Sequence, residues 1–202
     1  MKLFLVVYLV LFYGLAMFWR TYVIWRATGI NPYRLTHADG LAAFLGQLYR
    51  LVSVGIIGSV LIYSVAPAAW YAYLGPLHWL EGRVGTAVGI ILLISSLGLV
   101  LLAQAQMGRS WRIGIDEENQ TALVTHGIFR FSRNPIFLGM RLSMLGLFLV
   151  MPNALTLVLW LLGDVAIQAQ VFLEEQHLGQ QHGVNYEQYQ ATTPRYLGLP
   201  SR

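Results

Sequence analysis

The sequence predicts an all-α integral membrane protein with about five transmembrane helices, the last two joined as a hairpin. Hydrophobic residues make up 56% of the 202 residues and charged residues only 11%, whereas a soluble domain carries about 25% charged residues. The apolar residues gather in segments that approach the ~20 residues needed to cross a bilayer. The chain contains no cysteine, which excludes a disulfide framework, a thiol nucleophile and a thiolate metal site.

Five apolar segments are candidates for these spans. They are Leu3–Trp19, Leu45–Val65, Val84–Gln104, Pro135–Val150 and Ala154–Leu173. The first could be taken for a signal peptide, but it lacks an Ala-x-Ala-like exit and is followed directly by Arg20 and Arg26. We therefore expect it to remain in the protein as a helix.

The distribution of arginines predicts the orientation in the membrane. With five spans, the loops at 20–44 and 105–134 and the tail after 174 share one side, and this side carries most of the arginines. The other side has only Lys2 and Arg83. The positive-inside rule then places the N-terminus outside and the C-terminus in the cytoplasm.

The last two spans are separated only by the Pro-Asn dipeptide at 152–153, which predicts a tight turn. With the turn there, Arg141 lies level with Asp164, and Glu174 returns to the membrane edge that holds Arg133. Charges inside a membrane rarely stand alone, so we expect Arg141 and Asp164 to pair and to hold the hairpin together.

Asn134-Pro135 is a strong helix start, because Asn caps helices well and Pro suits the first helical position. The start of a helix offers free N–H groups and the positive end of the helix dipole, which suit an anionic group. Arg133 beside it could bind a carboxylate through two hydrogen bonds.

These motifs also carry a family resemblance. The sequence from about Met107 to the C-terminus resembles the isoprenylcysteine carboxyl methyltransferase and phospholipid methyltransferase families, which are integral membrane enzymes that use S-adenosylmethionine. Asn134 stands where those families have histidine, and Phe137 where they have tyrosine. The resemblance rests on Gly127-Ile128-Phe129-Arg130, Arg133-Asn134-Pro135-Ile136-Phe137, an apolar hairpin, Glu174-Glu175, Tyr186-x-x-Tyr189 and Pro194-Arg195.

The resemblance implies a cofactor pocket that faces the cytoplasm, with S-adenosylmethionine as the cofactor. It implies that Arg133 and Asn134 act in catalysis, and that Glu174 holds the ribose hydroxyls or the ammonium group of the cofactor. Backbone groups from residue 121 to residue 124 would pair with the adenine edge, and Phe129 would pack on it. The implied cofactor-binding residues are Thr121, Ala122, Leu123, Val124, Phe129, Asn134, Pro135, Ile136, Phe137, Glu174 and Glu175.

Gln170 stands where the carboxyl methyltransferases carry an arginine for the carboxylate of the acceptor, and we expect it to meet the acceptor. Glutamine cannot supply that positive charge, so the acceptor stays open among a prenylated thiol acid, a lipid amine and another small apolar molecule. The histidines show no His-Glu-x-x-His spacing, and we expect no metal. The arginines are spread over loops, so we expect no nucleic-acid partner.

We divide the chain into N-terminal transmembrane helices, 1–106, and a cofactor-binding methyltransferase region, 107–202, within one structural domain. Two alternatives remain open. Membrane sterol reductases have a similar C-terminal motif and use NADPH, and a non-enzymatic membrane protein could keep a degenerate site. Methyl transfer asks little acid–base chemistry of the protein, because the cofactor brings an activated leaving group.

Overall fold

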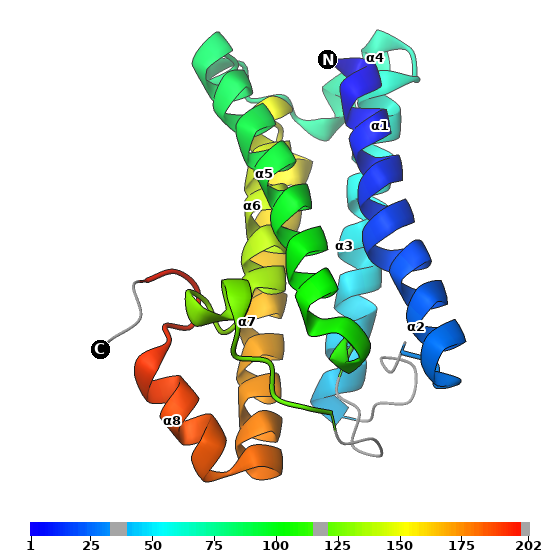
Figure 1. Ribbon diagram of the computed structural model, residues 1–202. Helices are drawn as coiled ribbons and strands as arrows, with labels where there is room; N and C mark the ends of the chain where they lie inside the picture. Colours follow the sequence, from blue (N-terminus) through cyan, green and yellow to red (C-terminus); the bar gives the residue numbers. More distant parts are fainter. Residues whose placement is uncertain (33–39, 115–120, 199–202) are drawn as a thin grey trace.

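The computed structural model describes residues 1–32, 40–114 and 121–198, and within them it contains helices and no strand. The long helices run side by side as one bundle (Figure 1). The described segments form α1 (Lys2–Leu11), a π-helical stretch (Phe12–Trp19), α2 (Arg20–Thr28), α3 (Gly40–Ser64), the short α4 (Ala68–Tyr71), α5 (Arg83–Met107), α6 (Pro135–Val150), α7 (Ala154–His182) and α8 (Val184–Thr192), with 3-10 turns at Ala72–Leu74, His78–Leu80, Gly108–Ser110 and Gly127–Arg130.

Four helical stretches of the described chain are long and apolar enough to cross a membrane: Lys2–Thr28, Gly40–Ser64, Arg83–Ser110 and Ala154–His182. The fifth predicted span is α6, an apolar helix of 16 residues, which reaches about 24 Å at 1.5 Å per residue. The predicted all-α membrane architecture is therefore confirmed, with four to five helices able to span.

Two predicted spans end earlier in the chain than the helices of the structure do. The first was expected to end at Trp19, yet the helix continues to Thr28 and stops at Gly29, which has a φ of 72°. The last was expected to end at Leu173, yet α7 continues to His182 and stops at Gly183, which has a φ of 51°. In both cases apolarity is lost before helicity, and the helix ends only at a glycine with a positive φ.

Helices α5 and α6 pack closely along a line of small residues. A Cβ atom on Gly89 would lie 2.8 Å from the carbonyl oxygen of Gly146, and one on Gly139 would lie 3.2 Å from that of Ser96. Side chains at these positions would push the two helices apart, which is the usual role of small residues between membrane helices.

The hairpin turn at Pro152-Asn153 is confirmed. The Asn153 side chain accepts a hydrogen bond from the Thr156 backbone at 2.9 Å and caps α7, while the Thr156 hydroxyl reaches back to the Asn153 backbone N–H at 3.3 Å. This reciprocal cap satisfies the first free donors of the helix. The connection between α4 and α5 is tied to the same turn through Gly75, whose carbonyl oxygen accepts from the Ala154 N–H at 2.8 Å.

Polar contacts hold the first helix in the bundle. The Tyr8 hydroxyl lies 2.9 Å from the hydroxyl of Ser96 on α5 and 2.6 Å from that of Ser143 on α6. At the other end of this helix, Arg20 donates to the carbonyl oxygens of Gln104, at 2.5 Å, and Gly108, at 2.7 Å. These bonds fix the first helix against α5 and α6.

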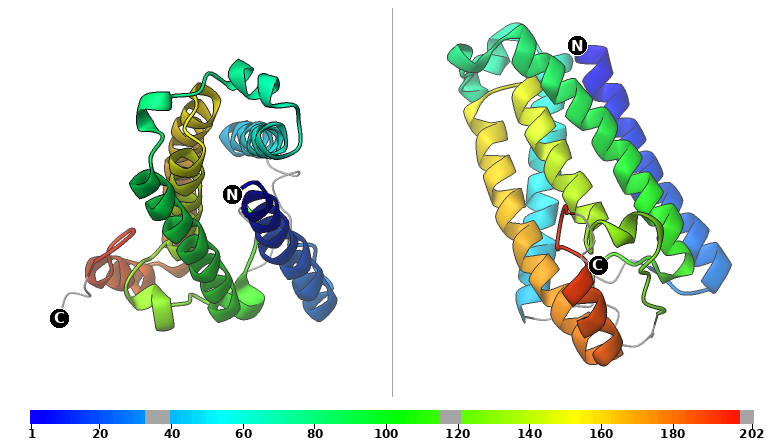
Figure 2. Two further views of the ribbon diagram at one scale, coloured as in Figure 1. Left: turned by 90° about the horizontal axis from the view of Figure 1, so that it is seen from above. Right: turned by 60° about the vertical axis from the view of Figure 1, so that its left-hand side comes forward.

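The tail after α7 folds back on the bundle. Helix α8 turns beside the end of α7, and the chain after it returns toward the start of α6 (Figure 2). The Pro194 carbonyl oxygen accepts a hydrogen bond from the Arg133 backbone N–H at 3.0 Å. The division into regions at residue 106 stays a prediction.

Candidate functional site

The hairpin brings the Arg133-Asn134 dipeptide and Glu175 together at the end of the bundle away from the N-terminus (Figure 1). Glu175 Oε1 accepts hydrogen bonds from Arg133 Nε at 3.2 Å, Arg133 Nη2 at 3.1 Å and Asn134 Nδ2 at 3.0 Å. Residues 41 and 42 positions apart in the chain thus meet, as expected from the predicted turn at Pro152-Asn153.

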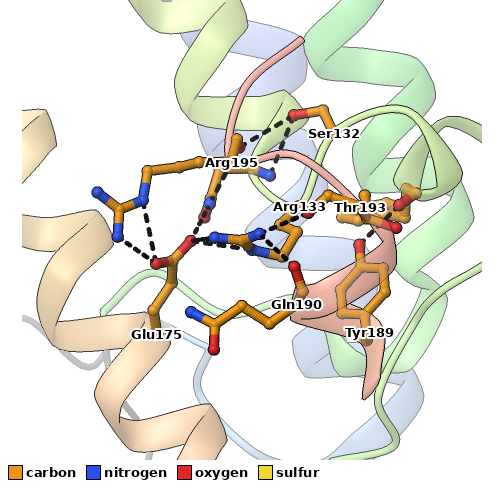
Figure 3. A network of polar contacts seen from close by, with 9 residues as sticks. Ser132, Arg133, Glu175, Tyr189, Gln190, Thr193 and Arg195 are labelled. Carbon is orange, nitrogen blue, oxygen red and sulfur yellow. Dashed lines mark hydrogen bonds and ion pairs between the residues drawn. The ribbon is translucent and has the colours of Figure 1, made fainter. Parts of the chain in front are cut away.

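Glu175 has a second arginine partner in the tail. Its Oε2 accepts from Arg195 Nε at 3.0 Å and from Arg195 Nη2 at 2.7 Å. The Glu175 side chain is only 6% exposed and the Arg133 side chain 9%, whereas that of Arg195 is 48% exposed. Both carboxylate oxygens are therefore engaged, and one nearly buried negative charge lies between two positive charges (Figure 3).

Arg133 also binds the backbone of the tail. Its Nη1 donates to the carbonyl oxygens of Gln190, at 3.1 Å, and Thr193, at 2.5 Å (Figure 3). Four of the five N–H donors of the guanidinium are thus used within the protein. The arginine connects α6, α7 and the segment that follows α8.

The prediction that the Asn134 side chain caps α6 is wrong. Asn134 occupies the cap position and Pro135 the first helical position, but the Asn134 side chain makes no cap hydrogen bond. It turns instead to Glu175 and to the Arg195 carbonyl oxygen, at 3.3 Å. The amide NH2 group needs an acceptor, and the helix start offers donors only. The Glu175 carboxylate is a strong acceptor for this group. No side chain caps the start of α6.

Glu174 belongs to a different group of contacts from Glu175. Gln170, one turn earlier on α7, donates from Nε2 to Glu174 Oε1 at 3.0 Å. Consecutive residues on a helix point about 100° apart, so the two glutamates serve different surroundings. Tyr49 of α3 interacts electrostatically with the Glu174 carboxylate. The structure thus brings the predicted acceptor residue Gln170 beside the predicted cofactor residue Glu174.

The segment before α6 lies on α5 and the tail. The Ile128 N–H donates to Gln106 Oε1 at 2.7 Å, and the Tyr189 hydroxyl donates to the Phe129 carbonyl oxygen at 2.7 Å. Gly127 has a φ of 61° and lies against the Gln106 side chain, which explains why a glycine occupies this turn. Phe129 is buried, as a packing role requires.

The remaining predicted cofactor residues surround this region without forming one described contact set. Residues 121–124 have no regular secondary structure, and the Ala122 carbonyl oxygen accepts from the Ser110 hydroxyl at 3.2 Å. Pro135 is fully buried, Ile136 is partly exposed, and Phe137 packs against the cluster of Val52, Met144, Ile167 and Val171. Their contact with a cofactor stays a prediction.

The predicted pair inside the hairpin is confirmed. Arg141 Nε donates to Asp164 Oδ1 at 2.5 Å, and Gln168 Nε2 donates to Asp164 Oδ2 at 2.7 Å. The two charged side chains are 30% and 22% exposed, so the pair lies on the flank of the hairpin and is only partly buried. The Arg141 guanidinium lies 4.6 Å from the centre of the Tyr196 ring, a cation–π contact with the tail.

Comparison with known proteins identifies the family. Residues 84–185 match the sequence model of the family described as phospholipid methyltransferase, which is half of the chain. The chain belongs to the phospholipid methyltransferase family. The match includes the hairpin, both glutamates and the segment before α6, and it ends at residue 185, in the first turn of α8.

Two relatives of this family are each named a probable protein-S-isoprenylcysteine O-methyltransferase, one from Oryza sativa subsp. indica and one from Oryza sativa subsp. japonica. Each is 32% identical to this chain over 120 residues, which is 56% of this chain and 60% of the relative. The aligned part thus spans about 60% of the length of these relatives. No solved structure matches the chain.

Several residues of this phospholipid methyltransferase family member were not assigned a role from the sequence. Arg195 was noted only as part of a tail motif, and Ser132, Thr193 and Gln190 were not singled out, although Figure 3 shows all of them beside Arg133. The available signal was charge, because a buried carboxylate is costly unless it is paired, and Arg195 is the arginine of the tail motif.

Charge and burial affect the ionisable groups of the tail. The hydrogen bonds to Glu175 raise the pKa of the Arg195 guanidinium above its usual value. Burial raises the pKa of Tyr186 to about 12 and also raises the pKa of Tyr189. Arg195 therefore stays charged and both phenols stay neutral at physiological pH, so Tyr189 keeps the proton that it donates to Phe129.

Proposed function

We propose that the protein is a membrane-embedded methyltransferase that uses S-adenosylmethionine and methylates a lipophilic acceptor. The observation that carries the proposal is the meeting of the Arg133-Asn134 dipeptide with Glu175 at the start of α6, within the stretch that matches the family. The names of the two Oryza relatives support the same reaction class. We also propose, from the positive-inside rule, that this end of the bundle faces the cytoplasm.

The residues present fit such a cofactor in their donor set. S-adenosylmethionine has a carboxylate, an ammonium group, ribose hydroxyls and an adenine edge, and when bound it supplies the activated methyl group. The start of α6 has no side-chain cap, so the N–H groups of Ile136 and Phe137 suit a carboxylate at the positive end of the helix dipole. The Glu174 carboxylate suits the ammonium group or the ribose hydroxyls.

The role proposed for Arg133 is to complete this carboxylate site with its remaining donor while its other donors hold Glu175 and the tail. Asn134 would help to hold Arg133 in place, because both side chains donate to the same Glu175 oxygen. Because both Glu175 oxygens already accept from arginine, we assign Glu175 to positioning these residues. The strip Thr121–Val124 and Phe129 would lie along the adenine.

The rest of the reaction depends on alignment and on exclusion of water. Between the helices lies a small cavity that is open at one side. It is lined mainly by apolar and aromatic side chains of α1, the π-helical stretch, α3, α6 and α7, among them Leu9, Val52, Met144 and Ile167. This apolar lining suits the apolar part of a lipophilic acceptor.

Binding of labelled S-adenosylmethionine and of labelled NADPH to the detergent-purified protein tests the proposal and its main alternative together. We expect binding of S-adenosylmethionine only. Glu174→Gln should weaken it by about tenfold or more, because a hydrogen bond to a charged group contributes ~1.5–3 kcal/mol. Arg133→Ala should weaken it as well.

Glu187→Gln is the matched control, because Glu187 lies exposed on α8 and makes no side-chain hydrogen bond among the described residues. Its affinity for S-adenosylmethionine should equal that of the parent. Binding of NADPH in place of S-adenosylmethionine, or unchanged affinity in both Glu174→Gln and Arg133→Ala, would refute the proposal.

A further inference from the structure

Arg141 uses only one of its hydrogen-bond donors within the described chain. Its Nε donates to Asp164, while its two Nη groups, which carry four of the five N–H donors of a guanidinium, have no hydrogen-bond partner among the described residues. The side chain is 30% exposed, so these donors reach the protein surface. Arg141 lies within the apolar helix α6, where the surface of a membrane protein faces hydrocarbon and little water. Donors in such a place need an acceptor from outside the chain.

Two further donors without an acceptor belong to the tail beside Arg141. The Tyr196 ring lies on the Arg141 guanidinium, and its hydroxyl is buried without a hydrogen-bond partner among the residues that the structure describes. The preceding residue, Arg195, uses Nε and Nη2 for Glu175, which leaves its Nη1 without a described partner. The Tyr196 hydroxyl interacts electrostatically with both arginines. We call Arg141, Arg195 and Tyr196 the flank donor group.

The carboxylates next to the flank donor group are already engaged. Each Asp164 oxygen accepts one hydrogen bond, from Arg141 or from Gln168. Both Glu175 oxygens accept from arginine. The flank donor group therefore presents unpaired donors and positive charge, and it lacks an anionic acceptor with several oxygens. A phosphate supplies these oxygens, and guanidinium groups bind phosphate through paired hydrogen bonds.

The surface beside this group favours the phosphate of a lipid over free phosphate. Val158, Leu161 and Val165 of α7 are exposed, and their spacing places them on one face of the helix, next to Asp164. An acyl chain can lie along this apolar face while its phosphate meets the arginines. Long arginine side chains reach from within the apolar region toward the level of the lipid head groups.

We propose that the flank donor group binds the phosphate of a membrane phospholipid on the outer flank of the hairpin. None of its three residues lines the cavity between the helices, so this lipid is separate from the methyl acceptor. The proposal does not depend on the methyltransferase function. Because Arg141 is on α6 and the other two residues are on the tail, the phosphate also joins the tail to the hairpin.

Two lipids with the same acyl chains test the role of the phosphate: dioleoylphosphatidylglycerol and dioleoylglycerol. Their binding to the detergent-purified full chain is measured by native mass spectrometry over a series of lipid concentrations. We expect phosphatidylglycerol to bind at least tenfold more tightly, roughly the effect of one hydrogen bond between charged groups. Equal binding of dioleoylglycerol would overturn the proposal. Inorganic phosphate is the competitor, and if it displaces phosphatidylglycerol at equal concentration, the site binds free phosphate and the lipid assignment is wrong.

Arg141→Gln removes the central charge of the flank donor group and should weaken phosphatidylglycerol binding by about tenfold. Arg130→Gln is the matched control, because Arg130 is an exposed arginine just before α6, and its affinity should equal that of the parent. An unchanged affinity in Arg141→Gln would refute the site. An equal loss in both variants would refute it as well, because general attraction between arginines and an anionic lipid would then explain the binding.

Asp164→Asn gives a second test with the opposite sign, and it serves if Arg141→Gln does not fold. The substitution keeps the shape of the side chain, removes the carboxylate that repels a phosphate and frees Arg141. It should therefore bind phosphatidylglycerol about threefold more tightly than the parent. A merely structural ion pair would lower stability in this variant without raising lipid affinity, and that result would contradict the proposal.

Discussion

Removing the charge of Glu175 should destabilise the open end of the hairpin and release the tail. Glu175→Gln keeps the size and shape of the side chain and leaves Arg133 and Arg195 without their shared carboxylate. In the parent protein this carboxylate accepts five hydrogen bonds from three residues. A glutamine oxygen can keep some of them, but its NH2 group must face an arginine that can only donate.

The size of the effect follows from burial. The Arg133–Glu175 pair has side chains 9% and 6% exposed, and removing one partner of a buried pair costs ~3–5 kcal/mol. Two backbone carbonyl oxygens also hold Arg133, which favours the lower end of that range. Arg195 is 48% exposed, so its ion pair with Glu175 contributes to stability as a surface pair does, ~0–1 kcal/mol. We expect a loss of about 3 kcal/mol in the free energy of unfolding.

The measurement is reversible unfolding in mixed detergent micelles, followed by circular dichroism, with Glu187→Gln as the control for the substitution itself. Glu187 is exposed on α8, and its variant should stay within about 0.5 kcal/mol of the parent. The double variant Arg133→Gln Glu175→Gln should lose less than the sum of the two single variants, because the second change removes the charge that the first left unpaired. A loss below about 1 kcal/mol for Glu175→Gln, or additive losses, would show that the network contributes little to the fold.

Three further predictions concern the clamp, the start of α6 and the topology. Arg141→Ala or Asp164→Ala should each lower the free energy of unfolding by about 1–3 kcal/mol, and the charge-swapped double variant should recover part of it; single variants that melt like the parent would refute this. Asn134→His should keep S-adenosylmethionine affinity in calorimetry, since a ring N–H can still donate to the carboxylate, whereas Asn134→Leu should lower it; equal affinities would remove Asn134 from the site. Reporter fusions after Trp79 and after Arg202 should lie on opposite sides of the membrane, and a cytoplasmic signal from both would contradict the five-span topology.

The hairpin and its pairings could be predicted from the sequence because they depend on simple geometry. A tight turn fixes which residues of two antiparallel helices lie level, so Arg141 meets Asp164 as expected. Helix ends could not be predicted as well. Hydropathy marks where a segment leaves the membrane, while helicity continues until a residue such as Gly183 favours another backbone conformation.

The partner of the Asn134 side chain was not predictable in the same way. The local pattern Asn-Pro favours a cap, and a cap is the best partner within the local sequence. Folding brings Glu175 within 3.0 Å of the same amide, and a charged hydrogen bond to a distant segment wins over the local cap. The role of Arg195 was hidden for the same reason, since its partner is on α7 and the intervening α8 gives no periodic signal.

The tail joins the two charge clusters of the hairpin through consecutive residues. Arg195 binds Glu175, and Tyr196 stacks on Arg141, which is paired with Asp164. The position of this short segment depends on such contacts, which also include hydrogen bonds from Arg133 and Asn134 to its carbonyl oxygens. Loosening Arg195 should therefore weaken the contact of the neighbouring Tyr196 with Arg141.

This arrangement gives Glu175 an influence beyond its own contacts. Tyr196 packs on the same apolar cluster as Tyr49, and Tyr49 lines the cavity that we assign to the acceptor. If Arg195 is released, Tyr196 loses one of the contacts that hold it against this cluster. Acceptor binding in Glu175→Gln should then fall together with stability, whereas the loss in Tyr49→Phe should be confined to binding. The two variants together therefore distinguish a residue that positions the site from one that contacts the acceptor.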